Sequence, residues 1–565
     1  MEPATIAALL RELAVYYELD NDRHRAFAYE RAARSVEAAN GVLRLIDDGR
    51  LEELPGVGPS IARVVAELAR RGTVEVLDRQ RAKWPTIVIE LAQLPKVGVS
   101  KARRIYQTLA PANLDAVAAL CIAGALRELP GFGKISEQRI LQAIEDRRRQ
   151  GARILLVDAE GDASSLANHL RGDPAVHAVE LCGPVRRYSE VIDHLAYAVA
   201  SDHREAVAER LAGFALVTSV ERGADRGPVT GHLANGLRIE LHVAPRGKLG
   251  WAQIEATGST EHVALLRAHA AERGLELSAL AADDEAGFYR ALGLPVIPAE
   301  LRDGTDEVAA ALAGDDFHDL ITLADLTTAF HCHTTHSDGK GSIAEMADAA
   351  SELGFAAITI TDHSAAASYA SGLDAAGLRA QHAEIAALGD QLTGPRARIL
   401  RGTEADILAD GTIDVPRELI GELDVIIASV HQRHHLDQDA MTARLVTAMR
   451  QPFFKIWGHA LGRLVMRRAP IDVRIDEVLD AIADSPAAIE INGDPYRLDL
   501  DPDNARRAAR RGIKFVLSCD AHSTRGLGAT RYAVALARRA RLRKSDVLNA
   551  LPPYELAAAI RPRGR

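Results

Sequence analysis

The chain has 565 residues, of which 47% are hydrophobic, and it carries a formal net charge of −10. Single hydrophobic cores rarely grow beyond about 250–300 residues, so this length and composition argue against one small domain and against a disordered chain, and we expect three to five domains. The 4 cysteines form no CxxC pair, which argues against a disulfide framework or a thiolate zinc ribbon and is typical of a reducing compartment.

Charge and hydropathy patterns narrow the class of protein further. The acidic balance argues against a uniformly basic nucleic-acid-binding chain, but local patches can still bind DNA, and residues 1–150 carry a small excess of Lys and Arg. Charged residues interrupt the first twenty positions, where a signal peptide needs an apolar core, and no run of about 18 apolar residues occurs. We therefore expect a cytoplasmic protein outside the membrane, with a monomer favoured.

A repeat of the form L-P-x-x-G occurs three times in the first third, at Leu54–Gly58, Leu94–Gly98 and Leu129–Gly133. Each copy follows one helical pattern and opens another. Glycine permits a tight turn with positive φ, and the N–H groups that begin the next helix can hold a phosphate without contacting a base. One such turn is an ordinary connection between two helices, but three copies favour binding of the DNA backbone. The candidate DNA-binding glycines are Gly56, Gly58, Gly98, Gly131 and Gly133.

These turns resemble helix-hairpin-helix motifs. With the segment "DRHRAFAYERAARSVE" at residues 22–37, they resemble the amino-terminal and fingers domains of bacterial family X DNA polymerases, which are related to polymerase beta. The resemblance implies two helical DNA-binding domains, at residues 1–80 and 81–150. Lyase-active relatives carry a Schiff-base lysine where this chain has Val64, and valine cannot form an imine, so we expect no lyase activity there.

The middle of the chain resembles the palm and thumb of the same polymerases, which implies a palm at residues 151–245 and a thumb at 246–315. The stretch "GPVRRYSEVIDHLAYAV" begins at Gly183 and retains Arg186, Arg187 and Glu190. Aligned without gaps on these residues, the metal-binding aspartates of the family fall on three other side chains, which are His194, Ala196 and Glu240.

The remaining palm positions also depart from the family. Asp193 sits one place early and should project from the opposite strand face unless a bulge re-aims it. The phosphate-binding serine is replaced by Pro184, and the aromatic nucleotide-pocket motif reads "EATGS" at residues 255–259. Binding of Mg²⁺ or Mn²⁺ at the palm is therefore doubtful. Two alternatives stay open, a palm that only holds DNA and a polymerase with a rearranged site.

From about Leu326 short apolar strands alternate with amphipathic helices, in the pattern of a barrel of parallel strands. Polar clusters follow the strands, where the active site of such a barrel lies. His331 and His333 alternate on one strand face, as do Asp520 and His522, which turns Cys332 and Cys519 away as packing residues.

The polar set HxH, SDG, TDH, GTE, SVH, GH and CDAH resembles the PHP (polymerase and histidinol phosphatase) domain, which bacterial family X polymerases carry at the carboxyl end. The resemblance implies a distorted (β/α)7 barrel at residues 326–565 and gives a multidomain chain of α+β and α/β type. It also implies nine metal ligands with catalytic roles, which are His331, His333, Asp338, His363, Glu404, His431, His459, Asp520 and His522.

Six imidazoles and three carboxylates suit Zn²⁺ or Mn²⁺ better than Mg²⁺, which prefers oxygen ligands. Family analogy implies up to three ions with Glu404 as a bridge. The first would be held by His331, His333, Glu404 and Asp520, the second by Glu404, His431 and His459, and the third by Asp338, His363 and His522. Such a cluster supports hydrolysis of a phosphodiester.

Several basic residues near the strand ends are candidates for substrate contact. Arg463, Arg467, Arg468 and Arg497 are candidate phosphate ligands, with surface solubility as the alternative. The remaining set could equally be a solvated loop, and it consists of His336, Arg433, His434 and His435.

Together these features favour a DNA-binding, family X polymerase-like repair protein with 3′ to 5′ exonuclease activity in the PHP domain. We expect gapped duplexes, 3′ recessed duplexes and single-stranded 3′ ends as partners, and weak, Mn²⁺-dependent or absent polymerase activity. Two alternatives stay open, an active gap-filling polymerase with an atypical metal site and a catalytically silent DNA-binding scaffold.

Overall fold

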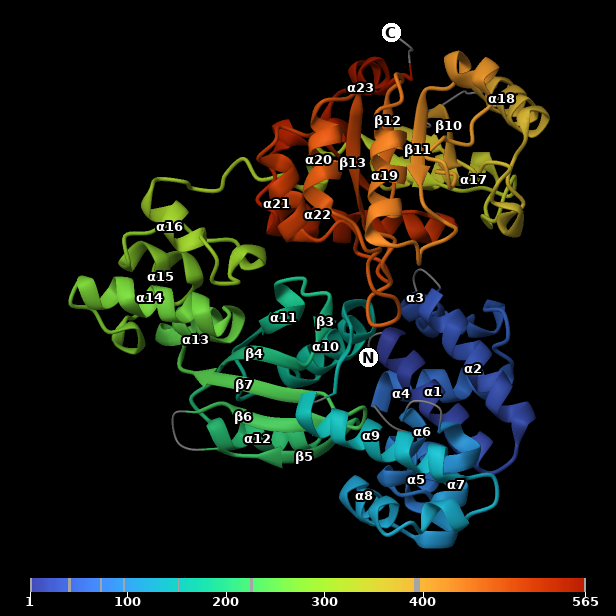
Figure 1. Ribbon diagram of the computed structural model, residues 1–565. Coiled ribbons are helices and arrows are strands. Elements are labelled where there is room, and N and C mark those ends of the chain that lie inside the picture. The colour runs from blue at the N-terminus through green and yellow to red at the C-terminus, as the bar shows by residue number, and fades with distance from the viewer. Residues whose placement is uncertain are drawn as a thin grey trace. The chain divides into compact units, whose positions relative to one another are not determined.

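A computed structural model describes residues 3–38, 42–71, 74–94, 97–150, 152–223, 227–390 and 397–562. The chain divides into two compact units, Met1–Gly314 and Asp315–Arg565, which are described separately (Figure 1). The mixed helical and sheet composition confirms the predicted α+β and α/β class.

Helices alone form the first part of the amino-terminal unit. Their bounds are α1 (Pro3–Leu19), α2 (Arg23–Ala38), α3 (Val42–Asp47), α4 (Pro59–Arg71), α5 (Glu75–Lys83), α6 (Thr86–Gln93), α7 (Gly98–Leu109), α8 (Leu114–Ile122) and α9 (Lys134–Gln150). Leu10, Val65, Leu91 and Ile105 are fully buried in one continuous apolar core that extends from α1 to α9.

In the described residues no single helix is long and apolar enough to span a membrane. Helices α7 and α8 meet the length and composition requirement only when they are taken together, and they are bent by 78° relative to each other.

The hairpin turns lie between these helices. In the first and third turns Gly56 and Gly131 have φ of 82° and 83°, where only glycine is unstrained. The N–H of Val57 donates to the Leu54 carbonyl over 3.0 Å, and the third turn repeats this bond. In the second turn Gly98 has a φ of 67°, and Pro95 and Lys96 lie outside the described residues.

The two remaining hairpin glycines face open space. A Cβ added at Gly58 or Gly133 would meet no atom within 4 Å, so the backbone at the start of α4 and α9 is accessible. Val64, at the position of the lyase lysine, is 6% exposed and packs in the helical core.

A five-stranded sheet with the order β2-β4-β7-β6-β5 forms the next part of this unit. β4 and β7 pair in parallel, and the other neighbours pair antiparallel. The strands and helices of this part are β1 (Ile154–Leu155), α10 (Leu156–Arg171), β2 (Ala178–Cys182), α11 (Gly183–Arg186), β3 (Val191–Ile192), β4 (His194–Ala200), α12 (Arg204–Ala212), β5 (Val217–Glu221), β6 (Val229–Leu233) and β7 (Arg238–Ala244). Ala196 and Ala198 of β4 face the helix that follows the sheet, and Tyr197 donates a hydrogen bond to the Ala163 carbonyl on the other face.

Four helices complete the unit, α13 (Leu249–Thr257), α14 (Thr260–Glu272), α15 (Glu285–Ala291) and α16 (Glu307–Leu312). Glu285 connects them to the sheet, because its carboxylate receives hydrogen bonds from both Arg186 and Arg302. Burial alone would raise the pKa of Glu285, but the two guanidinium groups outweigh burial and lower it to about 2.

The carboxyl-terminal unit is a nearly closed barrel of seven parallel strands in the order β14-β13-β12-β11-β10-β9-β8 (Figure 1). The strands are β8 (Thr328–Cys332), β9 (Ala357–Ile360), β10 (Arg398–Asp406), β11 (Val425–Ser429), β12 (Lys455–Trp457), β13 (Ala487–Asn492) and β14 (Phe515–Ser518). The helices are α17 (Ile343–Glu352), α18 (Ala375–Asp390), α19 (Gln438–Met449), α20 (Ile475–Ala483), α21 (Pro502–Ala509), α22 (Thr530–Arg539) and α23 (Pro553–Ile560). Past the end of β14 the N–H of Ala521 donates to the His331 carbonyl over 2.9 Å, which joins the two edges and confirms the distorted (β/α)7 barrel.

One end of the barrel is closed by apolar packing. Leu556 and Ile560 of α23 contact Phe330 and Val425 of the strands, and the Asn549 side chain donates to the carbonyl of Thr328, the first residue of β8. Residues 315–325, most of which fall outside the sequence-based domain boundaries, contact the barrel through ion pairs of Asp315 and Asp319 with Arg543. The other end, where the strands terminate, is therefore left for the polar residues.

Candidate metal centre

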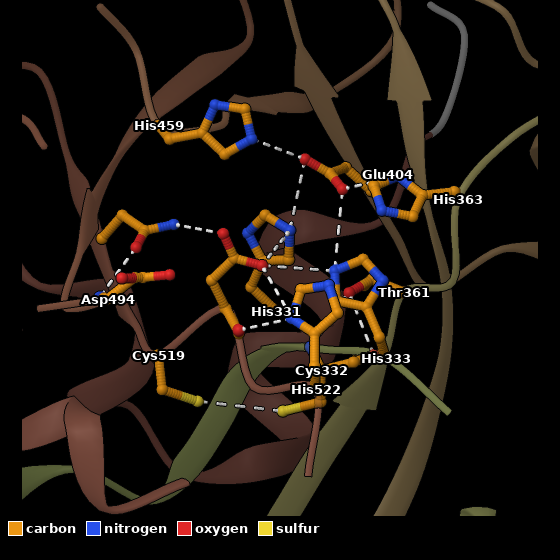
Figure 2. Close-up of polar contacts among 12 residues, drawn as sticks. His331, Cys332, His333, Thr361, His363, Glu404, His459, Asp494, Cys519 and His522 are labelled. Atoms are coloured by element: carbon orange, nitrogen blue, oxygen red, sulfur yellow. Dashed lines mark hydrogen bonds and ion pairs between the residues drawn. The ribbon is translucent and has the colours of Figure 1, made fainter. Parts of the chain in front are cut away.

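The nine predicted ligands come together at the carboxyl ends of the strands. Figure 2 shows the imidazoles of His331, His333, His363, His459 and His522 gathered around Glu404. His331 and Glu404 lie within strands β8 and β10, and the other seven ligands lie in the segments that directly follow β8, β9, β11, β12 and β14.

The backbone is distorted where it presents three of these ligands. His331, His459 and Asp520 have φ of 60°, 24° and 50°, in the left-handed region that non-glycine residues rarely adopt. β8 also shifts register between Ala329 and Cys332, so simple strand alternation does not describe how His331 and His333 reach the centre. Such conformations cost on the order of 1–3 kcal/mol each and cluster at functional sites.

Glu404 is the middle of the cluster. Its Oε1 lies 2.9 Å from His459 Nε2 and 3.1 Å from His431 Nε2, and its Oε2 lies 3.0 Å from His363 Nδ1. His331 Nε2 is 3.3 Å away from Oε1. Burial alone would raise the pKa of Glu404, but the surrounding imidazoles hold it well below its usual range, so this buried carboxylate is ionised.

The ligand atoms form three overlapping groups, each with all atoms within 4.8 Å of one another. The groups are His331, His333 and Asp520, then His363, Glu404 and His431, and finally His333, Asp338, His363 and His522. Each group differs by one residue from the set implied by the family analogy. The first lacks Glu404, the second contains His363 in place of His459, and the third also contains His333. His459 remains beside the second group through its 2.9 Å contact with Glu404.

Several ring nitrogens in the centre are buried and form no hydrogen bond of good geometry, although those of His331 and His363 lie 3.3 Å and 3.0 Å from oxygens of Glu404. Within the described chain these atoms include Nε2 of His331, both ring nitrogens of His333 and Nδ1 of His363. An unpaired buried imidazole nitrogen is costly, and a divalent cation satisfies it with a bond. The donor set of imidazoles and carboxylates therefore fits bound metal ions.

The carboxylates raise the proton affinity of most histidines around them. Burial lowers the pKa of His363 and His431, but Glu404 and the other neighbouring carboxylates outweigh it and raise the pKa values to about 10 and about 9. The pKa of His459 is instead lowered to about 4, mainly by burial and by the positive charge of Arg497. Because an imidazole must be neutral to bind a metal, loading the centre has to release protons from His363 and His431.

A second layer of buried acids, which the sequence interpretation missed, supports the ligands. His331 Nδ1 donates to Glu490 Oε1 over 2.5 Å, and Glu490 Oε2 accepts the backbone N–H of His459. His431 Nδ1 donates to Asp406 in the same way. These contacts leave Nε2 of His331 and His431 directed at the centre, as in carboxylate–histidine–metal arrangements. For Glu490 the signal in the sequence is one acidic residue in the otherwise largely apolar strand AAIEIN, whereas Asp406 ends the polar strand RILRGTEAD.

Asp362 fixes the loop that carries Asp338. It accepts hydrogen bonds from the Thr334 N–H over 2.8 Å and from the Thr334 hydroxyl over 2.7 Å. Gln381 of α18 donates to the same carboxylate. The loop is thereby tied to a fully buried anchor.

The cysteines do not take part in the centre. The Sγ atoms of Cys332 and Cys519 lie 4.0 Å apart and point toward each other behind the ligand layer (Figure 2). All four cysteines are free and buried, which agrees with the predicted packing role.

The candidate substrate-contact residues occupy different surroundings. Arg497 lies 3.2 Å from Asp520, one of the ligands, and Arg467 stacks on Tyr496 with 5.2 Å between its guanidinium carbon and the ring centroid. Arg463 and Arg468 donate to the carbonyls of Leu498 and Gly462. His336 is held 2.8 Å from Glu384, His434 is half-buried against Gly462, and Arg433 and His435 are exposed.

The palm positions do not form a comparable cluster. In the described residues the groups of metal-ligand type all lie in the barrel. Ala196 is 1% exposed and pairs with Glu240 between β4 and β7, and a Cβ at Gly183 would lie 2.8 Å from the Ala196 Cβ, so this position is filled by packing. Arg187 contacts Asp303 over 3.2 Å.

Asp193 and Glu240 are engaged by neighbouring cations or imidazoles. Asp193 lies in a bend between β3 and β4, and its Oδ1 is 2.7 Å from His194 Nδ1. Because the strand is interrupted at this residue, the alternation of a continuous strand does not by itself fix where Asp193 projects, and its face stays a prediction. Glu240 lies 2.8 Å from Arg238, and hydrogen bonding to His242 lowers its pKa.

Comparisons with known proteins agree with this arrangement. Residues 1–74 match a helix-hairpin-helix domain, residues 88–146 a SAM-like helix-hairpin-helix tandem, and residues 329–493 the PHP domain. The chain is 31% identical over 563 residues to the DNA polymerase/3′-5′ exonuclease PolX of Bacillus subtilis, covering 97% of this chain and 98% of the relative. The chain belongs to the PolX family.

Other relatives of this PolX family member match a shorter part of the chain. A probable phosphatase of Thermoanaerobacter sp. (strain X514) is 27% identical over 230 residues, which cover 39% of this chain and 88% of that protein. A probable phosphatase of Clostridium acetobutylicum is 33% identical over 141 residues, which cover 23% of this chain and 54% of that protein. The family membership confirms the predicted resemblance from the helical repeats to the PHP barrel.

Proposed function

We propose that this protein is a metal-dependent 3′ to 5′ DNA exonuclease whose chemistry takes place in the PHP barrel. The observation that carries the proposal is the convergence of nine imidazole and carboxylate ligands around the buried carboxylate of Glu404. PHP domains are metal-dependent phosphoesterases, and membership of the PolX family supports DNA as the substrate. Zn²⁺ or Mn²⁺ suits this nitrogen-rich ligand set, with up to three ions.

The nine ligands would hold the ions, with Glu404 as the shared ligand. Bound divalent ions supply Lewis-acid stabilisation of the phosphoryl oxygens and lower the pKa of water. Glu490 and Asp406 keep two histidines oriented with Nε2 toward the centre. Arg497, beside Asp520, provides positive charge for the phosphodiester at the same end of the barrel.

The amino-terminal unit would hold the DNA on which the barrel acts. The hairpin glycines present accessible backbone at helix starts, which suits contact with phosphates regardless of sequence. We propose gapped and 3′ recessed duplexes and single-stranded 3′ ends as substrates of a monomeric cytoplasmic repair enzyme.

We further propose that the palm contributes weak, Mn²⁺-dependent polymerase activity or none. Ala196 provides no ligand, and the carboxylate of Glu240 is already paired with Arg238. A working gap-filling polymerase would need another carboxylate at this position. A silent scaffold is disfavoured because all nine ligand types of the barrel are retained.

Replacement of Glu404 by alanine tests the nuclease assignment. Glu404→Ala removes the shared ligand, so 3′ to 5′ digestion of a recessed duplex should fall by orders of magnitude while DNA affinity, measured by fluorescence anisotropy, stays within a few fold. Glu418→Ala, an exposed acid of the same unit, is the matched control and should retain full digestion. Unchanged digestion by Glu404→Ala, with a contaminating nuclease excluded, would sink the assignment.

A further inference from the structure

An exposed tyrosine borders the metal centre. The ring centroid of Tyr369 lies 6.2 Å from that of His363 and 6.3 Å from that of His431. Both histidines belong to the ligand group that contains Glu404. The tyrosine itself is 64% exposed. An aromatic side chain thus stands beside the reacting groups with most of its surface uncovered.

The turn that carries Tyr369 is anchored by buried residues on either side of it. Tyr369 is the middle residue of a 3₁₀ turn between β9 and α18, and Ser368 before it is also exposed. Ala367, two positions before Tyr369, and Ala370, directly after it, are 1% and 2% exposed. The Ala367 N–H donates to the Ser364 carbonyl over 3.0 Å. A Cβ at Gly372 would lie 1.8 Å from that same carbonyl oxygen, so the chain approaches itself closely here. The ring is therefore presented outward by a fixed turn.

This turn is also tied to the segment that carries His431. The side chain of Gln432, the next residue after His431, donates to the Ala366 carbonyl over 3.0 Å. Ala366 in turn donates its N–H to Asp414 over 2.7 Å. These hydrogen bonds join the segment that leads into the turn of Tyr369 to the segment that carries His431, and the centroids of the two rings are 6.3 Å apart.

The chemistry around the ring selects a class of ligand. An accessible aromatic face suits a planar base, which stacks on it whatever its identity, whereas a small phosphate ester without a base gains nothing from it. Arg497 lies 3.2 Å from Asp520, which belongs to the ligand group of His331 and His333, and it supplies positive charge for a phosphate. An aromatic ring and a cation that both border one metal centre fit the two parts of a nucleotide.

We propose that Tyr369 stacks on the base of the 3′-terminal nucleotide and so makes the centre selective for nucleotide ends over base-free phosphate esters. The proposal rests on the proposed exonuclease function and specifies the substrate of that same site. It assigns Tyr369 a substrate-binding role that does not depend on its hydroxyl group.

The test uses the full-length, metal-loaded protein and two single-stranded oligonucleotides. One has an ordinary 3′-terminal nucleotide, and the other is identical but ends in a base-free tetrahydrofuran residue. For Tyr369→Ala we expect kcat/KM on the ordinary end to fall roughly 5- to 150-fold, the range of base–aromatic stacking, mainly through KM. On the base-free end the variant should match the unmodified protein within about twofold, since no stacking is lost there.

Two further variants complete the comparison. Tyr369→Phe keeps the ring and should digest both ends at nearly the normal rate. Tyr554→Ala removes a tyrosine that is 67% exposed on α23, the helix at the opposite end of the strands, and should change nothing. Metal content and thermal unfolding are measured for each variant.

The possible results separate the two proposals. An equal loss on both ends, a loss in Tyr369→Phe as large as in Tyr369→Ala, or no loss in either variant would overturn the stacking role. If the unmodified, metal-loaded protein digests neither oligonucleotide, the exonuclease function itself fails and the role of Tyr369 fails with it.

Discussion

Glu490 connects two of the metal-ligand residues through one buried carboxylate. One oxygen accepts Nδ1–H of His331, and the other accepts the backbone N–H of His459 and the side-chain amide of Asn492. The residue is fully buried, and interaction with His331 helps to lower its pKa despite burial, which alone would raise it. Glu490 therefore holds an orientation and a tautomer that metal binding requires.

Replacing this carboxylate by an amide should weaken metal binding. Glu490→Gln preserves the volume but loses the charge that fixes His331, so we expect the affinity for Zn²⁺ or Co²⁺ to fall about 10- to 100-fold. Titration of the metal-free protein in competition with a chromophoric chelator measures this directly. Glu307→Gln is a matched control, because Glu307 forms an equally buried pair with His262 in the other unit. Equal metal affinity for Glu490→Gln and the unmodified protein would refute this role.

At the scale of single residues, the candidate metal ligands could be proposed from the sequence because of their side-chain types. Few side chains bind divalent metals, so the nine candidates in short polar runs after apolar strands could be identified from the sequence. Glu490 in "AAIEIN" reads as one polar residue in a strand, and Tyr369 lies in a loop of small residues. Their roles depend on neighbours from distant segments, His331 for Glu490 and His431 for Tyr369. Sequence spacing contains no information on those contacts.

At the scale of elements, the hairpin turns could be predicted because glycine adopts a positive φ without strain and is therefore favoured in tight turns. The repeat correctly indicated turns before α4 and α9, and both have a positive φ at their first glycine. The second copy has Lys96 at that place, which lies outside the described residues, and its last residue, Gly98, has a φ of 67°.

A side chain at Gly131 should weaken DNA binding. Gly131→Val strains a position with φ of 83° and displaces the N–H groups at the start of α9, so affinity for duplex DNA should fall without a change in sequence preference. The slope of log affinity against log salt should become shallower as phosphate contacts are lost. Gly49→Val is the control, because Gly49 has a similar φ of 69° but lies outside the hairpin turns. If a folded Gly131→Val protein keeps both affinity and salt slope, the turn is only a connector.

The barrel strands show a different limit of prediction. Alternation of apolar strands and helices predicted parallel strands with polar residues at their ends, and the structure has this arrangement. It did not predict the register shift in β8 or the left-handed conformations of His331 and Asp520. We attribute those distortions to the need to bring candidate ligands from several strands within a few ångströms of one another. This requirement depends on contacts between strands, so the sequence of a single strand does not predict it.

For the whole molecule, the resemblance predicted helix-hairpin-helix domains followed by a PHP domain, and family models match in that order at residues 1–74, 88–146 and 329–493. Residues 315–325, most of which the predicted boundaries leave unassigned, contact the barrel through Arg543 and Lys544. The two units also differ in what they retain. The barrel has a residue of the expected type at every candidate ligand position, whereas Ala196 and Glu240, at two of the aligned palm positions, pair between β4 and β7.

This difference predicts an unequal division of activity, which primer extension can measure. Nucleotidyl transfer with two metal ions needs carboxylates that bind both ions. At the positions aligned with the family's aspartates the described residues provide Glu240, beside Arg238, with Asp193, beside His194, one position away from alignment. In a Glu404→Ala background, which removes competing digestion, we expect incorporation with Mg²⁺ to be absent and incorporation with Mn²⁺ to be weak at most, because Mn²⁺ tolerates nitrogen ligands better.

The same assay on three further variants decides whether the palm is a working site. Glu240→Ala and Asp193→Ala are added separately to the Glu404→Ala background, and Glu221→Ala, at an exposed position on β5 of the same sheet, is the control. Robust Mg²⁺-dependent extension that disappears with Glu240→Ala or Asp193→Ala, but not with Glu221→Ala, would show that the rearranged carboxylates still bind two ions. Extension that stays at background in every variant would leave the palm as a domain that holds DNA for the nuclease.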